Sequence, residues 1–272
     1  MYLDINDIKI YYEKYGNSKD TILILPGWGN TRQTFYYIIN YFKTTHTIYI
    51  LDYPGFGKSP IPSKTLTIYD YSELVINFMK KLNIHKPIII AHSFGGRIAS
   101  LLIGYHQCKL DKLIFIDIAG IKPKKTIKKI IKEKIYKLKR KLIQILPKEK
   151  HQIYCQKLLE KYASPDYLAL PPTMHQTFKN IINTDLTNYF KRIKNETLLI
   201  WGDKDYSTPL KDAYKLRKII PNSALIILKQ AEHYSYLNNP TLTNKIIYEN
   251  ASHYSYLNYP YLTLKIIEEF LK

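Results

Sequence analysis

The stretch KPIIIAHSFGGR, which runs from Lys86 to Arg97, constrains the fold of this chain more than any other. Its three consecutive isoleucines, residues 88–90, follow a proline and are typical of a strand buried on both faces of a parallel sheet. The residues that follow Ser93 favour a helix. A buried strand that turns sharply into a helix leaves Ser93 at the tip of the turn, and this predicts an exposed hydroxyl there.

Small residues stand two positions before and two positions after this serine, at Ala91 and Gly95. The small-x-Ser-x-Gly pattern lets the backbone fold tightly enough to expose the Ser93 Oγ. With its strand and helix, the stretch resembles the nucleophile turn of the α/β-hydrolase superfamily, although Ala91 replaces the first glycine. The resemblance extends over nearly the whole chain through motifs in the expected order. It implies that Ser93 is the nucleophile of a Ser-His-acid triad.

A second motif follows the strand expected over 21–25, where the sequence continues as PGWGN. In the resembled family, the loop after this strand supplies one amide of the oxyanion hole, usually from an H-G-x-G sequence. Pro26 replaces the histidine here, so only the Gly-Trp-Gly part carries over. The resemblance implies that the amides of Trp28 and Phe94 form the oxyanion hole, and a plain glycine turn is the alternative.

The strand expected over 47–51 ends in DYPGFGKS. Phosphate-binding P-loops share the Gly-Lys-Ser ending, but Asp52 stands where that motif requires its first glycine. A nucleotide site is therefore excluded at this loop. The same residues resemble the D-x-P-G-x-G-x-S loop of many α/β hydrolases, in which the loop is largely structural.

Two aspartates compete for the role of triad acid. The segment WGDKDYSTP, residues 201–209, follows an expected strand and resembles the acid-bearing loop of the family, with Asp205 in the acid position. The acid accepts a hydrogen bond from the histidine, fixes its tautomer and stabilises the imidazolium. Asp117, at the end of the strand expected over 112–116, is the alternative, because some relatives take their acid from that earlier strand.

The last expected strand, 224–228, is followed by His233, which matches the catalytic histidine of the family. Residues 231–250 then recur as 251–270 with fourteen of twenty positions identical, which indicates a tandem duplication. His253 is therefore the alternative to His233. We favour His233 because it lies five residues after a strand. His253 follows a presumed helix and would need a long excursion to reach the nucleophile.

Repeated alternation of strands and helices predicts an α/β fold, with a mostly parallel sheet of about eight strands and helices on both faces. The alternation stops after the sixth strand, and a helical cap, or lid, is expected over 121–194. The core would then consist of 1–120 and 195–272. Its second part carries the duplicated histidine loop and helix.

The first part of the expected cap is strongly basic. Lys122 to Lys150 contains thirteen lysines and arginines against Glu133 and Glu149, and isoleucines and leucines recur there at helical spacing. Such a helix can lie on an anionic membrane surface or gather acidic substrates. We favour a lid helix whose apolar face covers the site while its lysines are solvated.

Composition sets the remaining expectations. A chain of 272 residues with 46% hydrophobic content can form one α/β domain with an insertion. No signal peptide is recognised, and no apolar stretch approaches the roughly 18 residues of a membrane span. Cys108 and Cys155 lack metal-binding spacing, so a cytoplasmic location without metal or cofactor is expected.

The net charge of +19 accompanies an abundance of Lys, Ile, Tyr and Asn, the residues that A/T-biased codons produce. Codon usage therefore explains the charge, and no nucleic-acid partner is expected.

Together the motifs predict a serine hydrolase that cleaves a small carboxylic ester or thioester through an acyl-enzyme, with a small-molecule acyl substrate. Serine rather than aspartate at the turn disfavours dehalogenase and epoxide-hydrolase chemistry. Hydrolysis of C–C bonds or amides uses similar groups and stays open. A non-catalytic small-molecule-binding protein on a hydrolase scaffold also stays open, and no oligomeric state is predicted.

Overall fold

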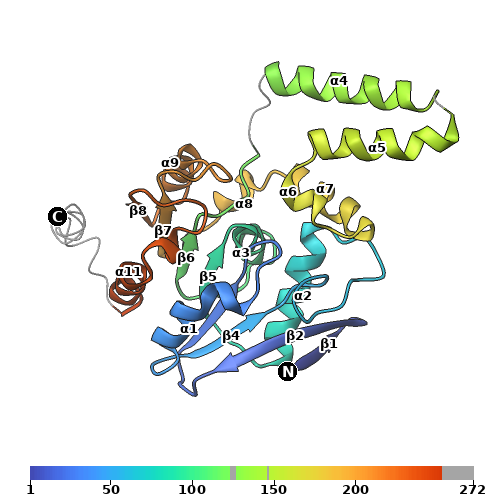
Figure 1. Cartoon of the computed structure of the whole chain (residues 1–272). Helices are drawn as coiled ribbons and strands as arrows, with labels where there is room; N and C mark the ends of the chain where they lie inside the picture. The colour runs from blue at the N-terminus through green and yellow to red at the C-terminus, as the bar shows by residue number, and fades with distance from the viewer. Residues whose placement is uncertain (123–126, 146, 253–272) are drawn as a thin grey trace. The chain divides into compact units, whose positions relative to one another are not determined.

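The computed structural model describes residues 1–122, 127–145 and 147–252 (Figure 1). The chain divides into two compact units, a core unit of residues 1–121 and 184–272 and an inserted unit of residues 122–183. The sequence predicts an insertion that ends at residue 194. In the structure, the segment 184–194 lies with the core unit.

The core unit is built on one eight-stranded sheet with the order β1-β2-β4-β3-β5-β6-β7-β8. β1 and β2 form an antiparallel hairpin at one edge, β2 pairs antiparallel with β4, and the remaining neighbours pair in parallel. This arrangement confirms the predicted mostly parallel sheet. The strands are β1 (Tyr2–Ile5), β2 (Ile8–Tyr15), β3 (Thr21–Leu25), β4 (Thr47–Leu51), β5 (Ile88–His92), β6 (Leu113–Ile116), β7 (Thr197–Gly202) and β8 (Ser223–Leu228).

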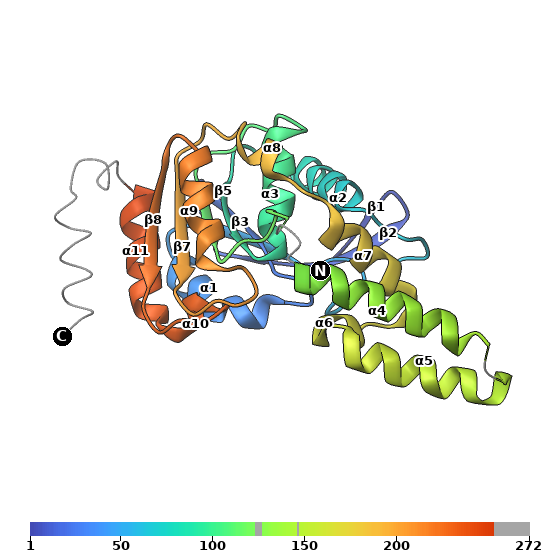
Figure 2. The same ribbon diagram turned by 90° about the horizontal axis from the view of Figure 1, so that it is seen from above.

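Helices cover both faces of this sheet, as Figure 2 shows. α1 and α11 pack on one face, α3 and α9 contact strands on the other, and α2 packs against α3. The helices of the core unit are η1 (Arg32–Phe35), α1 (Tyr36–Phe42), α2 (Ile68–Lys81), α3 (Phe94–Gly104), α8 (Thr187–Phe190), α9 (Leu210–Ile219), α10 (Ser235–Asn238) and α11 (Pro240–Ser252).

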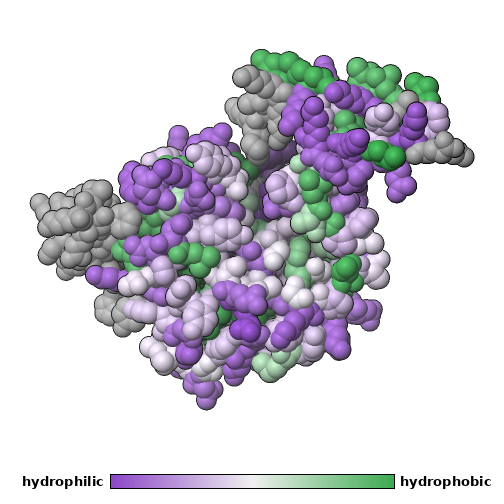
Figure 3. Space-filling model, in the orientation of Figure 1, coloured by the Kyte–Doolittle hydropathy of each residue, from purple (hydrophilic) through white to green (hydrophobic). Residues whose placement is uncertain are grey.

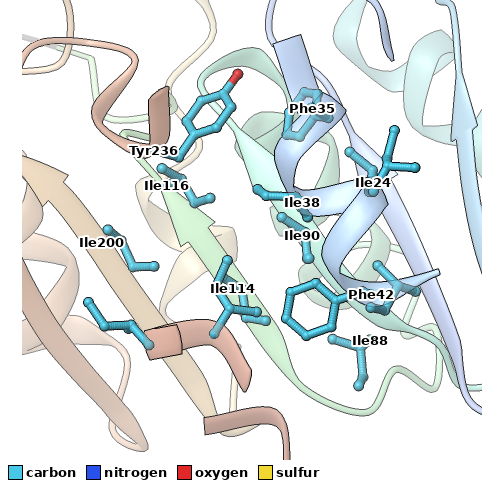
Figure 4. Packing of buried hydrophobic residues seen from close by; sticks show 14 of the residues in the cluster. Ile24, Phe35, Ile38, Phe42, Ile88, Ile90, Ile114, Ile116, Ile200 and Tyr236 are labelled. Atoms are coloured by element: carbon cyan, nitrogen blue, oxygen red, sulfur yellow. The ribbon is translucent and has the colours of Figure 1, made fainter. Parts of the chain in front are cut away.

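Alternate residues of the parallel strands form the hydrophobic cluster beneath α1 and α11 (Figure 4). Ile88 pairs with Ile22 of β3, and Ile90 pairs with Ile114 of β6, so the same face of each strand supplies an isoleucine. Phe42 of α1 is fully buried against them. Complete burial of such a side chain contributes roughly 1.5–3 kcal/mol, so this cluster stabilises the packing of α1 on the sheet.

The inserted unit is helical. α4 and α5 pack against each other, and the rings of Tyr136 and Tyr162 lie 5.5 Å apart between their centroids. The interpretation of this unit as a cap stays a prediction. Its elements are α4 (Ile127–Ile143), α5 (Lys148–Tyr162), α6 (Pro165–Leu168), η2 (Pro172–Met174) and α7 (His175–Asn183).

The second copy of the duplicated segment, 251–270, lies outside the described residues except for its first two positions. His253 is therefore outside the described residues. The first copy is described, and its helix is α11. Among the helices of the described ranges, none is long and apolar enough to cross a membrane.

Candidate active site

Ser93 occupies a strained turn between β5 and α3. Its backbone has φ 46° and ψ −109°, in a region that residues with a side chain rarely adopt. Neighbouring strand ends hold it there, because its amide donates to the carbonyl of Ile116 at 3.2 Å and its carbonyl accepts from Ala119 at 2.9 Å. The strain places the Oγ at the tip of the turn, as the motif predicts.

The glycines after the nucleophile are required by close packing. A Cβ on Gly95 would lie 1.9 Å from the carbonyl oxygen of Leu25, and a Cβ on Gly96 would lie 2.3 Å from the Cβ of Ile118. Ala91, which replaces the first glycine of the motif, lies within β5 and is not among the residues with positive φ. Its methyl group therefore fits the strand without backbone strain.

His233 joins Ser93 to an aspartate. The Nε2 of His233 lies 2.9 Å from the Oγ of Ser93, and its Nδ1 lies 2.8 Å from the Oδ2 of Asp205. A carboxylate can only accept, so Nδ1 carries the proton and Nε2 is left to accept from the serine hydroxyl. This is the geometry of an activated nucleophile, its base and the acid that orients the base.

The carboxylate of Asp205 is held by its own loop. One oxygen accepts from the amides of Ser207 at 2.7 Å and Thr208 at 2.9 Å, and the other lies 2.5 Å from the Thr208 hydroxyl. Burial alone would raise the pKa of Asp205, but the hydrogen bonds with His233 and Thr208 outweigh burial and hold the pKa below its ordinary value. The acid is therefore ionised and fixed beside the histidine.

Asp117, the alternative acid, occupies a different place. Its carboxylate accepts from the amide of Gly202 at 2.8 Å and from the amide of Ser235 at 3.0 Å, whereas the Nδ1 of His233 is paired with Asp205. Burial raises the pKa of Asp117 to about 7, and the charge of Asp205 acts in the same direction, against the two amide hydrogen bonds. Asp117 thus ties the end of β7 to the start of α10, the two segments that carry the acid and the histidine.

His92, the residue before the nucleophile, also holds the histidine loop. Its ring is fully buried, with Nε2 2.8 Å from the carbonyl oxygen of His233 and Nδ1 3.3 Å from the Nδ2 of Asn30. Asn30 in turn accepts from the hydroxyl of Tyr234 at 3.1 Å. Burial and the nearby charge of His233 lower the pKa of His92 to about 3, so the ring is neutral. A Cβ on Gly27 would lie 2.8 Å from Nδ1, so the glycine permits this approach.

The expected oxyanion loop is a tight turn. The amide of Asn30 donates to the carbonyl of Gly27 at 3.1 Å, and Gly29 has φ +75°, which a side chain would strain. Phe94 begins α3, so its amide lies at a helix N-terminus, where the helix dipole favours negative charge. The ring of Trp28 packs edge-on against Phe94, with centroids 5.2 Å apart. The role of the two amides as an oxyanion hole stays a prediction.

The structure thus brings together Ser93, His233 and Asp205 through hydrogen bonds, and Asp117 instead binds the amides of Gly202 and Ser235. The catalytic roles of these residues stay predictions. Sequence reasoning missed the part that His92 plays in holding the His233 loop. A histidine beside the nucleophile and an asparagine after Gly29 were the available signals. Within the described residues, no group of three or more His, Cys, Asp or Glu side chains could hold a metal ion.

Comparison with known proteins bears on the family and the fold of the chain. A family model described as alpha/beta hydrolase fold matches residues 20–133 and 147–240. The chain is 28% identical over 265 residues to the pimeloyl-[acyl-carrier protein] methyl ester esterase of Wigglesworthia glossinidia brevipalpis. This alignment covers 87% of this chain and 95% of that protein. It is 26% identical over 261 residues to an uncharacterized hydrolase, YugF, of Bacillus subtilis (strain 168). That alignment covers 89% of this chain and 94% of the hydrolase.

Among solved structures, the chain is similar to a bromoperoxidase from Bacillus anthracis, with a TM-score of 0.72 and 18% sequence identity. The likeness covers 93% of this chain and 99% of the other. At this identity the likeness bears on the fold alone.

Proposed function

The chain belongs to the α/β-hydrolase fold family, and on this premise we propose that it hydrolyses a small carboxylic ester or thioester through an acyl-enzyme on Ser93. The observation that carries the proposal is the continuous hydrogen-bonded series from Asp205 through His233 to Ser93. A serine hydroxyl becomes a good nucleophile at neutral pH when an adjacent base takes its proton, and the position of His233 suits that role.

In the proposed reaction, the Oγ of Ser93 attacks the carbonyl carbon of the substrate while Nε2 of His233 takes the hydroxyl proton. Asp205 stabilises the imidazolium that forms. His233 then gives the proton to the departing alcohol or thiol, which leaves Ser93 acylated. Water attacks the acyl-enzyme with His233 again as base, and the released products are a carboxylic acid and the free serine.

Negative charge develops on the carbonyl oxygen in both steps. We assign its stabilisation to the amides of Trp28 and Phe94. A single donor aimed at a developing oxyanion is worth about 3 kcal/mol, so loss of one would slow the reaction by roughly a hundredfold. Phe94 is supported by its place at the start of α3, and Trp28 by the tight turn in which it lies.

The comparisons favour an ester among the possible substrates. One relative that matches along almost its full length is named as a methyl ester esterase. The same chemistry would accept a thioester, because His233 can protonate a departing alcohol or thiol alike.

Hydrolysis of short p-nitrophenyl esters and acyl thioesters tests the proposal. We expect turnover by the wild type and a loss of at least about a thousandfold in kcat for Ser93→Ala. Ser100→Ala is the matched control, because this buried serine lies on α3 and its Oγ donates to the carbonyl of Arg97 at 2.8 Å. Activity that survives Ser93→Ala would contradict the proposal. Binding of acyl compounds without turnover would instead support the non-catalytic alternative.

A further inference from the structure

The inserted unit carries an apolar stripe along α4, which we call the α4 stripe. Its six side chains are between 39% and 77% exposed. At 100° per residue they fall within an arc of about 140° on the helix surface. Figure 3 shows hydrophobic residues gathered along α4 beside hydrophilic ones. The members of the α4 stripe are Ile127, Ile130, Ile131, Ile135, Leu138 and Leu142.

The stripe is not the face that holds α4 to α5. The contact with α5 runs through the Tyr136 ring, which meets the Tyr162 ring at 5.5 Å, and Ile143 is only 8% exposed. Helical geometry puts Tyr136 and Ile143 on the side of α4 roughly opposite to the stripe. The helical pair is therefore packed without the stripe, and its apolar area is free to meet something else.

Lysines border the stripe on both sides. By helical position, Lys134 and Lys141 fall within the arc on the side of Ile130, and Lys137 lies just beyond Ile130. Lys139 lies about 40° beyond Ile135 at the other edge, whereas the Nζ of Lys132 lies over the Tyr162 ring of α5. Over its length α4 has eight lysines and arginines against the single carboxylate of Glu133. Long cationic side chains can reach past buried aliphatic groups to negatively charged groups in water.

As an alternative to the site-covering role expected of this helix from the sequence, we propose that the α4 stripe docks the protein on an anionic lipid bilayer surface. The six aliphatic side chains would enter the boundary between headgroups and acyl chains, and the bordering lysines would meet lipid phosphates. α4 would lie along the surface, because its many cations are spread over its whole length. This inference goes beyond the proposed hydrolysis and does not depend on it.

Two other occupants fit the stripe less well. A nucleic acid offers phosphates to the lysines but no matching surface for six aliphatic side chains. A second copy of the chain could cover the stripe, but it would bring Lys134, Lys137 and Lys141 of each copy against the same lysines of the other. Anionic lipid supplies both the hydrocarbon and the negative charge.

Co-sedimentation of the full chain with vesicles tests the proposal. We expect binding to vesicles of phosphatidylcholine mixed with phosphatidylglycerol, little binding to phosphatidylcholine alone, and weaker binding as salt rises from low to physiological ionic strength. No sedimentation with the anionic vesicles at low salt would overturn the proposal.

Two sets of variants test the surface itself. Lys134→Glu, Lys137→Glu and Lys141→Glu together should weaken vesicle binding by about 100-fold or more, because each lysine near the surface contributes about fivefold. The matched control reverses Lys211, Lys215 and Lys218, which are exposed on α9 of the core unit and change the net charge equally. Equal losses in the two triple variants would mean that total charge acts without the α4 stripe.

The apolar half has its own readout. Leu138→Trp should show a blue-shifted emission with anionic vesicles and quenching by brominated lipid, whereas Tyr214→Trp on α9 should show neither. The two side chains have similar exposures of 59% and 55%. Ile131→Ser with Leu138→Ser should weaken vesicle binding while the circular dichroism spectrum is unchanged. An unchanged affinity in this double variant, or an RNA shift or dimer in place of vesicle binding, would overturn the proposal.

Discussion

The ring of His92 is joined to the backbone of His233 by a hydrogen bond of 2.8 Å from Nε2 to the carbonyl oxygen. Because a carbonyl only accepts, this contact fixes the tautomer of His92 and leaves its Nδ1 to accept from Asn30. The residue before the nucleophile thus positions the loop that carries the base. The nucleophile and its base are held to each other through the backbone as well as through their side chains.

His92→Phe removes both hydrogen bonds of this ring while it keeps an aromatic side chain in the buried site. We expect kcat for ester hydrolysis to fall by about ten- to a hundredfold with KM little changed, because a displacement near 1 Å at the base costs about that much. Steady-state kinetics on a p-nitrophenyl ester measures it. Tyr234→Phe, which removes only the outer hydroxyl on Asn30, should have a smaller effect. Equal kcat in wild type and His92→Phe would contradict a positioning role.

The assignment of the acid is tested by two substitutions of the same kind. Asp205→Asn should lower kcat by about a thousandfold to ten-thousandfold, because the amide cannot fix the tautomer of His233 or stabilise its charge. Asp117→Asn should mainly lower the melting temperature, since asparagine keeps one acceptor oxygen for the Gly202 and Ser235 amides and turns an NH2 donor towards the other amide. Kinetics and thermal unfolding of both variants separate the roles. The reverse pattern would make Asp117 the acid.

The raised pKa of Asp117 predicts a pH dependence of folding. The folded state keeps the proton up to about pH 7, whereas the unfolded state loses it near the ordinary carboxyl pKa. Between these values the folded state binds more protons, so the stability that Asp117 adds is fully present near pH 4 and falls as the pH rises to about 7. Urea unfolding of wild type and Asp117→Asn at several pH values measures it. A stability difference that grows with pH would contradict the expected sign.

The duplicated C-terminal segment offers a matched pair of histidines. We expect His233→Ala to lose about a thousandfold or more in kcat, because His233 contacts both Ser93 and Asp205. His253→Ala changes the equivalent position of the second copy and should keep nearly full activity. Rates of ester hydrolysis by both variants show which histidine is the base. If His253→Ala is inactive and His233→Ala is not, the second copy supplies the base.

Much of the core could be predicted from the sequence. The strands Thr21–Leu25 and Thr47–Leu51 have the predicted bounds, because short β-branched runs between turn residues are typical of the largely buried strands of a parallel sheet. The contacts among Ser93, Asp205 and His233 follow the same logic. Each residue was found at the carboxyl end of a strand, and parallel strands bring those ends to one edge of the sheet.

Other features depend on contacts between distant segments. Asp117 looked like an acid because it ends a strand, but its two oxygens are taken by amides 85 and 118 residues away. The hydrogen bond from His92 spans 141 residues. The isoleucines of α4 showed the helical period, yet the period alone does not say which face meets α5. None of these pairings leaves a local signal in the sequence.

Covalent labelling with a fluorophosphonate probe, read by intact mass, tests the central claim most directly. Such probes react with a serine only when a neighbouring base has activated it. We expect a single adduct on the wild type that is absent from Ser93→Ala and formed much more slowly in His233→Ala. No adduct on the folded wild type, or an adduct that persists in Ser93→Ala, would contradict the claim that Ser93 is an activated nucleophile.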